Sequence, residues 1–235
     1  MESDEQLSEE AKVWANQNRK QFAKRFLSEV EPEIFEQTVS LFMAGSPGAG
    51  KTEFSKRLLE TLLPDYQKYI VRIDPDEIRQ QLPQYVAGKA ERFQAAVSIL
   101  VERIHDQALK EKKSFLLDGT LSNLPKARNN IQRSLNKQRF VQIFYIYQDP
   151  LVAWELTQKR EAVEGRNIPK ESFVEQYFLS QENVTILKQE YKENIQVEFF
   201  SRNTKTGRYD FVTNVTKIDN MIDSRYSRDT LLQAL

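Results

Sequence analysis

The sequence contains no cysteine and only one histidine, His105. It can therefore form no disulfide, use no thiol nucleophile and build no zinc site from cysteine and histidine. His105 falls within a helical pattern of apolar residues over 93–108, and a surface or helix-packing role is favoured there over a catalytic one. Any chemistry must come from carboxylates, hydroxyls and basic side chains.

Net charge is also absent, because 34 lysines and arginines balance 34 aspartates and glutamates. Binding to a polynucleotide usually requires a basic groove, so the composition gives no strong nucleic-acid signal. No apolar run approaches the roughly 20 residues that cross a bilayer. The acidic start of the chain lacks the basic and apolar regions of a secretory signal. We expect a cytoplasmic protein with no membrane partner.

Glycine is scarce too, but three of the seven glycines fall within one eight-residue segment. The segment reads Gly45, Ser46, Pro47, Gly48, Ala49, Gly50, Lys51, Thr52 and matches G-x-x-x-x-G-K-[ST], the phosphate-binding loop of P-loop proteins. Glycines let successive backbone N–H groups turn inward toward an anion. Lys51 can reach the β- and γ-phosphates of ATP, and Thr52 can offer its hydroxyl to Mg²⁺. A glycine-rich turn that matches by chance is the alternative, but an apolar strand pattern precedes the loop and a helical pattern follows it.

The remaining pattern alternates strands with helices. Buried-strand patterns occupy 38–44, 69–73, 114–117, 140–147 and 196–200. This alternation predicts an α/β fold, a P-loop kinase-like three-layer sandwich around a parallel sheet of about five strands. We expect a kinase domain over 38–235, preceded by an N-terminal helical extension over 1–37. The extension would contain one or two helices ending near 31–33, and a plain structural role is favoured over covering the site or binding a partner.

Acidic side chains follow two of the expected strands. Asp74 and Asp76 come after the second strand, and Asp118 comes directly after the third. Because ligands of parallel sheets bind at the carboxyl ends of the strands, these residues should lie beside the phosphate loop. Asp118 suits a metal-binding role, and Asp76 or Asp74 suits a base that deprotonates an attacking hydroxyl. Each aspartate could instead cap the helix that follows it.

A helix should begin at Asp149-Pro150, in a segment over about 150–170 that has the features of a lid. Arg160 and Arg166 flank Gly165 there. Arginines on a mobile segment can stabilise the negative charge on a phosphoryl group during transfer. The alternative is a solvated basic helix end.

Three absent motifs narrow the class of P-loop protein. The guanine-reading Asn-Lys-x-Asp motif is missing, since Asn136-Lys137-Gln138-Arg139 lacks the aspartate. The third strand ends in a lone Asp118 rather than in the Asp-Glu pair of a hydrolytic motor. The dinucleotide fingerprint G-x-G-x-x-G is also absent. A small kinase that transfers phosphate to a bound hydroxyl remains.

Four segments together resemble the zeta toxin family: 45–52, 73–79, 117–120 and 159–170. The resemblance covers about residues 38–203. It implies an ATP- and Mg²⁺-dependent kinase that phosphorylates the 3′-hydroxyl of the amino sugar in UDP-N-acetylglucosamine, and it allows for an antitoxin partner. It also assigns roles to single residues: Asp76 would be the general base, Asp118 would match the family's acidic residue before Gly-Thr, and Arg160 and Arg166 would stabilise the transferred phosphate. We also expect Thr52 and Asp118 to hold the metal, and Asp76, Arg79, Asp118 and Thr120 to contact the acceptor.

The chain departs from the family on the acceptor side. Leu82-Pro83 stands where many members have His-Pro, and Asp118 replaces a residue that is often glutamate. The acceptor could therefore be a different nucleotide, an antibiotic or a polynucleotide end. A nucleotide-binding module without catalysis is the alternative from another class.

Overall fold

The computed structural model describes residues 4–32, 34, 36–83, 85–164, 167–203, 206, 208–222 and 225–235, with backbone alone at 62 and 162–164. Six strands form one sheet in the order β2-β3-β1-β4-β5-β6. They are β1 (Val39–Ala44), β2 (Ile70–Ile73), β3 (Ser114–Leu117), β4 (Phe140–Tyr147), β5 (Gln196–Arg202) and β6 (Tyr209–Val212). β1 to β5 are parallel, and β6 runs antiparallel to β5. The five predicted strands are thus confirmed, and the sixth was not predicted.

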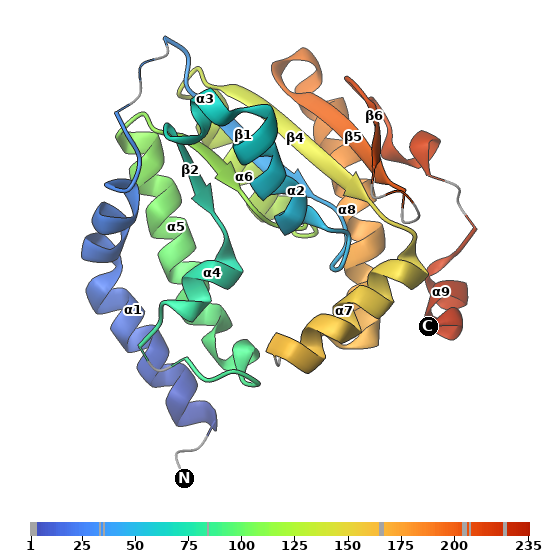
Figure 1. Cartoon of the computed structure of the whole chain (residues 1–235), viewed down its shortest axis with the longest axis horizontal. Coiled ribbons are helices and arrows are strands. Elements are labelled where there is room, and N and C mark those ends of the chain that lie inside the picture. The colour runs from blue at the N-terminus through green and yellow to red at the C-terminus, as the bar shows by residue number, and fades with distance from the viewer. Residues whose placement is uncertain are drawn as a thin grey trace.

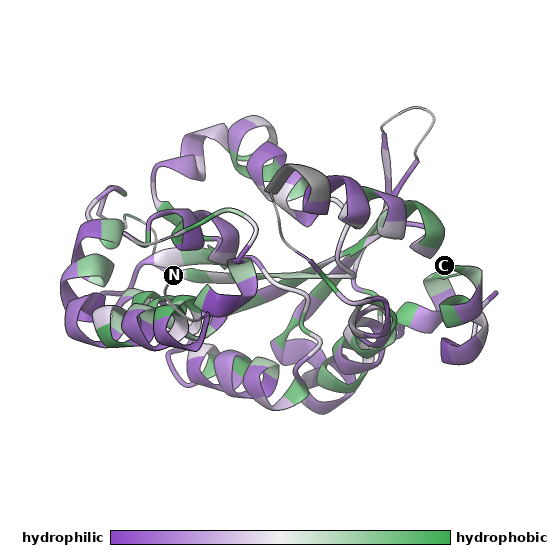
Figure 2. Ribbon diagram, turned by 90° about the horizontal axis from the view of Figure 1, so that it is seen from below, coloured by the Kyte–Doolittle hydropathy of each residue, from purple (hydrophilic) through white to green (hydrophobic). Residues whose placement is uncertain are grey.

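Helices cover both faces of the sheet, as the three-layer prediction requires (Figure 1). The helices are α1 (Asp4–Leu27), α2 (Lys51–Arg57), α3 (Pro64–Gln67), α4 (Pro75–Gln80), α5 (Gln94–Lys110), α6 (Leu124–Leu135), α7 (Pro150–Glu164), α8 (Lys170–Tyr191) and α9 (Arg228–Ala234). Shorter turns are the π-helical η1 (Leu58–Leu62) and the 3₁₀ turns η2 (Ala90–Phe93), η3 (Lys192–Asn194) and η4 (Ile218–Met221). Seen from below, the largely hydrophobic strands lie between helices with hydrophilic outer surfaces (Figure 2).

Successive residues of β1 point to opposite faces of the sheet and belong to two different hydrophobic cores. Phe42 and Ala44 join the larger core with α1, α5, α6 and α8, while Leu41 and Met43 join a smaller core with α2 and η1. The alternation follows from the two-residue period of a strand. A third cluster around Phe173 joins α7, α8 and α9. The central strand therefore has apolar partners on both faces, which anchors the loop that follows it.

The N-terminal segment forms the single helix α1, which ends at Leu27, four residues before the expected end. It packs along α5 (Figure 1), and its buried side chains, including Phe22 and Leu27, belong to the larger core. Burial at these positions explains why one continuous helix forms in a strongly charged segment. Docking on the core is the arrangement seen, and the domain boundary at residue 37 stays a prediction.

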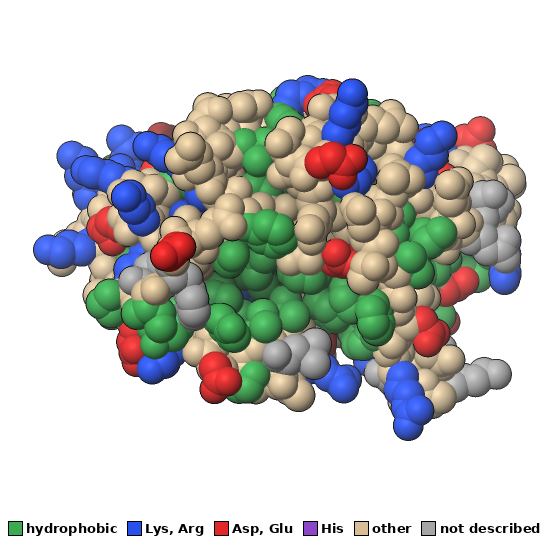
Figure 3. Space-filling model, turned by 90° about the horizontal axis from the view of Figure 1, so that it is seen from above, with side chains coloured by type: hydrophobic (Ala, Val, Ile, Leu, Met, Phe, Trp, Pro, Cys, Tyr) green, Lys and Arg blue, Asp and Glu red, His purple; other side chains and the backbone are tan. Residues whose placement is uncertain are grey.

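The parallel strands begin at the top of Figure 1, and Figure 3 views the molecule from that side. Apolar side chains gather around the middle of this face. Ile34 and Tyr66, in segments that precede β1 and β2, are among the exposed large apolar residues of the chain.

None of the helices in the described ranges is long and apolar enough to cross a bilayer.

Candidate active site

A cavity of about 420 Å³ opens at the carboxyl ends of the parallel strands. Its lining comes from the loop after β1, the start of α4, the segment after β3, the start of α6, and α7. Most of the residues proposed from the sequence line it together: Gly48, Gly50, Lys51, Thr52, Asp76, Arg79, Asp118, Thr120 and Arg160. Arg166 lies outside the described residues. The fold therefore brings the phosphate loop and the strand-end acids into one space, as the topology predicts.

Two loop glycines are required by close backbone contacts. A Cβ atom on Gly45 would lie 2.2 Å from the carbonyl oxygen of Ile146, and one on Gly48 would lie 2.0 Å from that of Ala153. Their φ angles of +126° and +71° are also unfavourable for other residues. Ala153 is on α7, so the absence of a side chain at Gly48 lets the phosphate loop lie directly against this helix.

Lys51 spans the loop from the first turn of α2. Its ammonium donates hydrogen bonds to the carbonyl oxygens of Gly45, over 3.1 Å, and Ser46, over 2.7 Å. Gly50 takes a left-handed conformation as the N-cap of α2, which points the first N–H groups of the helix at the loop. Together these donors form a site suited to the phosphates of a nucleotide.

Thr52 and Asp118 form the part of the site that suits a cation. The Thr52 hydroxyl donates to Asp118 Oδ2 over 3.4 Å. Asp118 is buried at 6% exposure, and burial raises the pKa of its carboxyl to about 6, against the opposing effect of Lys51. Among the described residues there is no group of three or more acidic or histidine side chains that could hold a metal. One carboxylate and one hydroxyl nevertheless fit Mg²⁺, which keeps several waters and shares the phosphate oxygens of its nucleotide.

Asp74 and Asp76, either of which could be the base according to the sequence, have different surroundings in the structure. Asp74 is buried, accepts from the backbone N–H of Asp76 over 2.8 Å as the N-cap of α4, and pairs with Arg72 over 2.9 Å. The Asp76 side chain lies in the first turn of α4, lines the cavity and is 25% exposed. Asp74 therefore has the capping role, although both carboxylates line the cavity, and the Asp76 side chain is the more exposed of the two.

Arg79 fixes Asp76 from the next turn of α4. Its Nη1 donates to Asp76 Oδ1 over 2.5 Å, and its Nη2 donates to Gln94 Oε1 over 3.0 Å. Arg79 is only 4% exposed although it lines the cavity. Sequence reasoning missed Gln94, together with Asn123 and Asn130 of the adjoining wall. Asn123 could have been found as the N-cap before Leu124-Pro125, whereas Gln94 and Asn130 carry no sequence signal.

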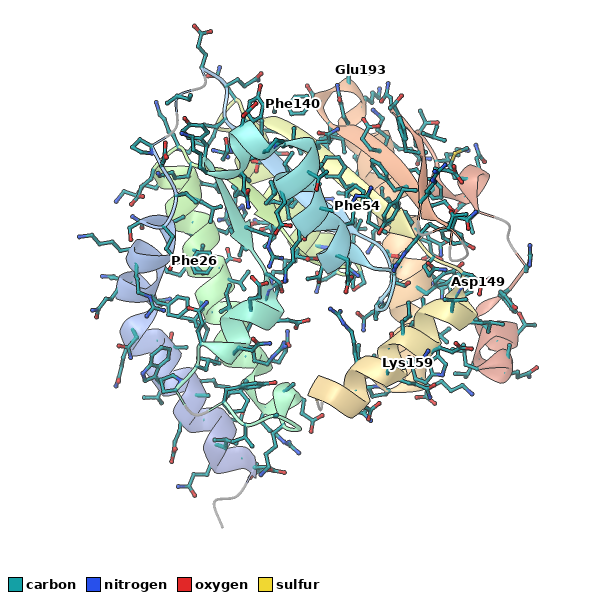
Figure 4. All side chains as sticks on the ribbon, in the orientation of Figure 1. Phe26, Phe54, Phe140, Asp149, Lys159 and Glu193 are labelled. Carbon is teal, nitrogen blue, oxygen red and sulfur yellow. The ribbon has the colours of Figure 1, made fainter. Side chains whose placement is uncertain are left out.

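The predicted lid helix begins where expected. The Asp149 carboxylate accepts from the backbone N–H of Leu151 over 3.0 Å and caps α7. Figure 4 shows Asp149 at the start of α7 and Lys159 further along the same helix. Arg160, the next residue, lines the cavity and pairs with Glu53 of α2 over 3.6 Å. The helix continues to Glu164, so Arg160 lies one turn before its end and its side chain is 39% exposed, a setting that also fits a solvated basic helix end.

His105 lies in the core between α5 and the sheet, away from the cavity. Its ring meets those of Phe42 and Phe115 edge-on, with centroids 6.5 and 4.8 Å apart. Burial lowers the pKa of its imidazole to about 3, so the ring is neutral at physiological pH. The packing role expected from the sequence is the one the structure shows.

Comparisons with known proteins agree with this geometry. The zeta toxin family model matches residues 24–213. A solved structure from the PezAT chromosomal toxin–antitoxin system of Streptococcus pneumoniae has a TM-score of 0.70 and 18% identity, covering 94% of this chain and 92% of that one. The AvrRxo1-ORF1:AvrRxo1-ORF2 complex with sulphate ions gives a TM-score of 0.62 at 15% identity, and the same complex with ATP gives 0.60 at 16%. Each match covers 88% of this chain and 65% of the other. No curated protein sequence matches the chain.

The structural likenesses establish the fold, and the family model adds the sequence pattern. Its match begins within α1 and ends just beyond β6, so it includes the phosphate loop, both acidic strand ends and α7. The chain therefore belongs to the zeta toxin family.

Proposed function

We propose that the protein is an ATP- and Mg²⁺-dependent kinase that phosphorylates a hydroxyl of a sugar nucleotide, with UDP-N-acetylglucosamine as the first candidate. The observation that carries the proposal is the shared cavity, in which Lys51 and Thr52 face the strand-end acids Asp76 and Asp118. A phosphate donor site and a carboxylate base therefore adjoin. That combination is what phosphoryl transfer to a hydroxyl requires.

The donor half would hold the triphosphate. Lys51 would exchange its two loop carbonyls for the β- and γ-phosphates, and the N–H groups at the start of α2 would contact the same oxygens. Thr52 and Asp118 would hold Mg²⁺, which when bound neutralises charge on the phosphate oxygens. ATP in the AvrRxo1-ORF1:AvrRxo1-ORF2 complex belongs to a protein of similar fold, and it supports this use of the site.

The acceptor half would supply the base. Asp76 would accept the proton of the attacking hydroxyl. The hydroxyl oxygen would bond to the γ-phosphorus while the bond between that phosphorus and the leaving oxygen of ADP breaks. Arg79 holds the Asp76 carboxylate in place. Arg160 would stabilise charge on the transferred group, and the family resemblance assigns Arg166 the same task. Both arginines would act through hydrogen bonds to phosphate oxygens.

The choice of acceptor rests on the family and on the polar lining. Thr120, Asn123, Asn130 and Gln94 line the same cavity as Asp76 and can hydrogen-bond hydroxyl and amide groups of a sugar. The net charge of zero argues against a polynucleotide acceptor. Another small hydroxyl acceptor is the second candidate, favoured by the departures at Leu82 and Asp118 from the family pattern.

An antitoxin protein is the proposed partner. The solved structures of similar fold come from the PezAT toxin–antitoxin system and from a complex of two gene products. We therefore expect this kinase to be held inactive by a protein partner until that partner is removed.

The kinase proposal is tested by incubating the protein with γ-labelled ATP, Mg²⁺ and a panel of acceptors. The panel contains UDP-N-acetylglucosamine, other sugar nucleotides, nucleosides and oligonucleotides. Label should appear on UDP-N-acetylglucosamine and be lost in the Lys51→Ala variant. Label on another acceptor would replace the substrate, whereas ATP binding without any phosphorylated product would favour the non-catalytic module.

A further inference from the structure

The hairpin of β5 and β6 places a cation beside the phosphate loop, outside the cavity described above. A Cβ atom on Gly50 would lie 3.3 Å from Arg202 Nη1 and 3.7 Å from the hydroxyl of Tyr209. Arg202 is the last residue of β5, and Tyr209 pairs with it in register at the start of β6. The guanidinium and the phenol therefore approach the loop at the turn where α2 begins.

Arg202 is held there by the packing of its neighbour. Tyr209 is partly buried, and its ring meets that of Phe54 edge-on with centroids 5.3 Å apart. Phe54 lies on α2 directly after the loop residues, and Figure 4 shows it between α2 and the strands. The hairpin position is thus fixed to the helix that carries the phosphate loop. Among the ion pairs of the described residues, none includes Arg202.

The position also corresponds to a defined part of a bound nucleotide. In a P-loop the backbone N–H groups cradle the α- and β-phosphates, and the N–H groups at the start of the following helix bind the same phosphates. Gly50 to Glu53 form that start here. Arg202 therefore lies beside the end of the loop where the α-phosphate is expected, outside the cavity that Lys51 and Arg160 line.

We infer that Arg202 is a second cation of the donor site and binds the α-phosphate of the nucleoside triphosphate, with Tyr209 as its positioning residue. The inference rests on the proposed function, since it assumes a nucleotide donor. A planar guanidinium suits a phosphate oxygen pair better than an ammonium does. Arg202 would distinguish a donor that carries an α-phosphate from pyrophosphate, which fills the loop alone.

Glu53 should weaken nucleotide binding at the same place where Arg202 strengthens it. Its Oε2 would lie 3.8 Å from the same point on Gly50, and its Oε1 is 3.6 Å from Arg160 Nη2. The carboxylate thus occupies the space between the two arginines near the expected α-phosphate. A bound nucleotide would have to compete with it, because two anions in that space repel each other.

The test measures binding of ATP and of inorganic pyrophosphate by calorimetry, with Mg²⁺ and without acceptor. Arg202→Gln should raise the Kd for ATP about tenfold, the loss expected for one charge-assisted hydrogen bond, and leave the Kd for pyrophosphate unchanged. Arg202→Lys should fall between wild type and Arg202→Gln. Arg208→Gln, which removes an exposed arginine from the same hairpin, is the matched control and should bind ATP like wild type. Glu53→Gln should lower the Kd for ATP about threefold.

The outcomes separate the two proposals. Equal ATP affinities for wild type and Arg202→Gln would overturn the inference and leave the kinase proposal standing. An equal loss of ATP and pyrophosphate binding would also overturn it, because the α-phosphate would then not be the group recognised. A wild-type protein that binds neither ligand would overturn both proposals.

Discussion

Arg79 donates to the Asp76 carboxylate over 2.5 Å from the next turn of the same helix, and its guanidinium is 4% exposed. This pair differs from an ordinary i,i+3 surface pair because one partner is desolvated and is anchored again at Gln94. Its effect is to fix the Asp76 oxygens relative to the cavity. We expect an acceptor hydroxyl to approach this carboxylate from the cavity, as a general base requires.

The first prediction concerns Asp76→Asn. This variant keeps an oxygen for Arg79 but loses the base, so kcat should fall by about 10²–10⁴-fold while the Kd for ATP stays near the wild-type value. Phosphotransfer assays and calorimetry on the same preparation would measure both. Lys51→Ala provides the contrast, since it should lose ATP binding together with turnover. Near-wild-type turnover of Asp76→Asn on the true acceptor would show that the base is assigned wrongly.

Glycine variants make a second, structural prediction. Gly48→Ala should lower the free energy of unfolding by roughly 2–4 kcal/mol, because the new Cβ would lie 2.0 Å from the Ala153 carbonyl oxygen and the positive φ is strained. The corresponding drop in Tm is about 5–10 °C, accompanied by loss of ATP binding. Thermal unfolding followed by circular dichroism measures the first effect.

Two other glycines supply controls for that experiment. Gly88→Ala introduces backbone strain alone, since φ is +89° and no atom lies within 4 Å of its Cβ. Gly119→Ala introduces neither strain nor contact. The expected order of Tm is therefore Gly119→Ala highest, Gly88→Ala next and Gly48→Ala lowest. A Gly48→Ala protein as stable as Gly119→Ala would contradict the close packing of the loop against α7.

The third prediction concerns the lid. Arg160→Gln should lower kcat about a hundredfold or more, since one donor to the transferred phosphoryl group is removed. Arg160→Lys keeps the charge without the planar fork and should retain part of the activity. The Glu53 pair is exposed, so neither variant should change stability by more than about 1 kcal/mol. If Arg160→Gln raised KM for ATP and left kcat unchanged, the arginine would bind the ground state instead.

The sequence predicted those parts of the fold that local patterns determine. The apolar run of β4 and the glycine spacing of the phosphate loop are short-range signals, and both were found at the expected residues. β6 was missed because it has four residues, three of them exposed, and exists only through pairing with β5. The end of α1 was placed too late because no glycine or proline marks Leu27.

In the site, too, residues within local motifs could be predicted from the sequence, whereas contacts that arise from tertiary packing could not. Motif residues such as Lys51 and Asp118 were placed correctly in the cavity because strand order fixes which loops meet there. The capping role of Asp74 depends on one backbone hydrogen bond, although Pro75 at the first helical position is a local hint that Asp74 is the cap. Gln94 reaches Arg79 only through the packing of α4 on α5, which no spacing in the sequence records.

The last prediction uses the only histidine of the chain as a probe of stability. Burial lowers the pKa of His105 to about 3 in the folded protein, against 6.5 for an ordinary histidine. The unfolded chain therefore takes up the proton first as the pH falls, so the stabilising contribution is complete above about pH 6.5 and declines toward pH 3. Asp118 acts in the opposite direction, because its pKa is raised to about 6 and the folded state gains its proton first. Comparing wild type with His105→Leu cancels the Asp118 effect, since both proteins retain that residue. Between pH 7.5 and pH 5 the free energy of unfolding of wild type should fall by about 2 kcal/mol more than that of the variant, as measured by urea unfolding. Parallel pH profiles for the two proteins would mean that the imidazole is hydrated or hydrogen-bonded in the folded state.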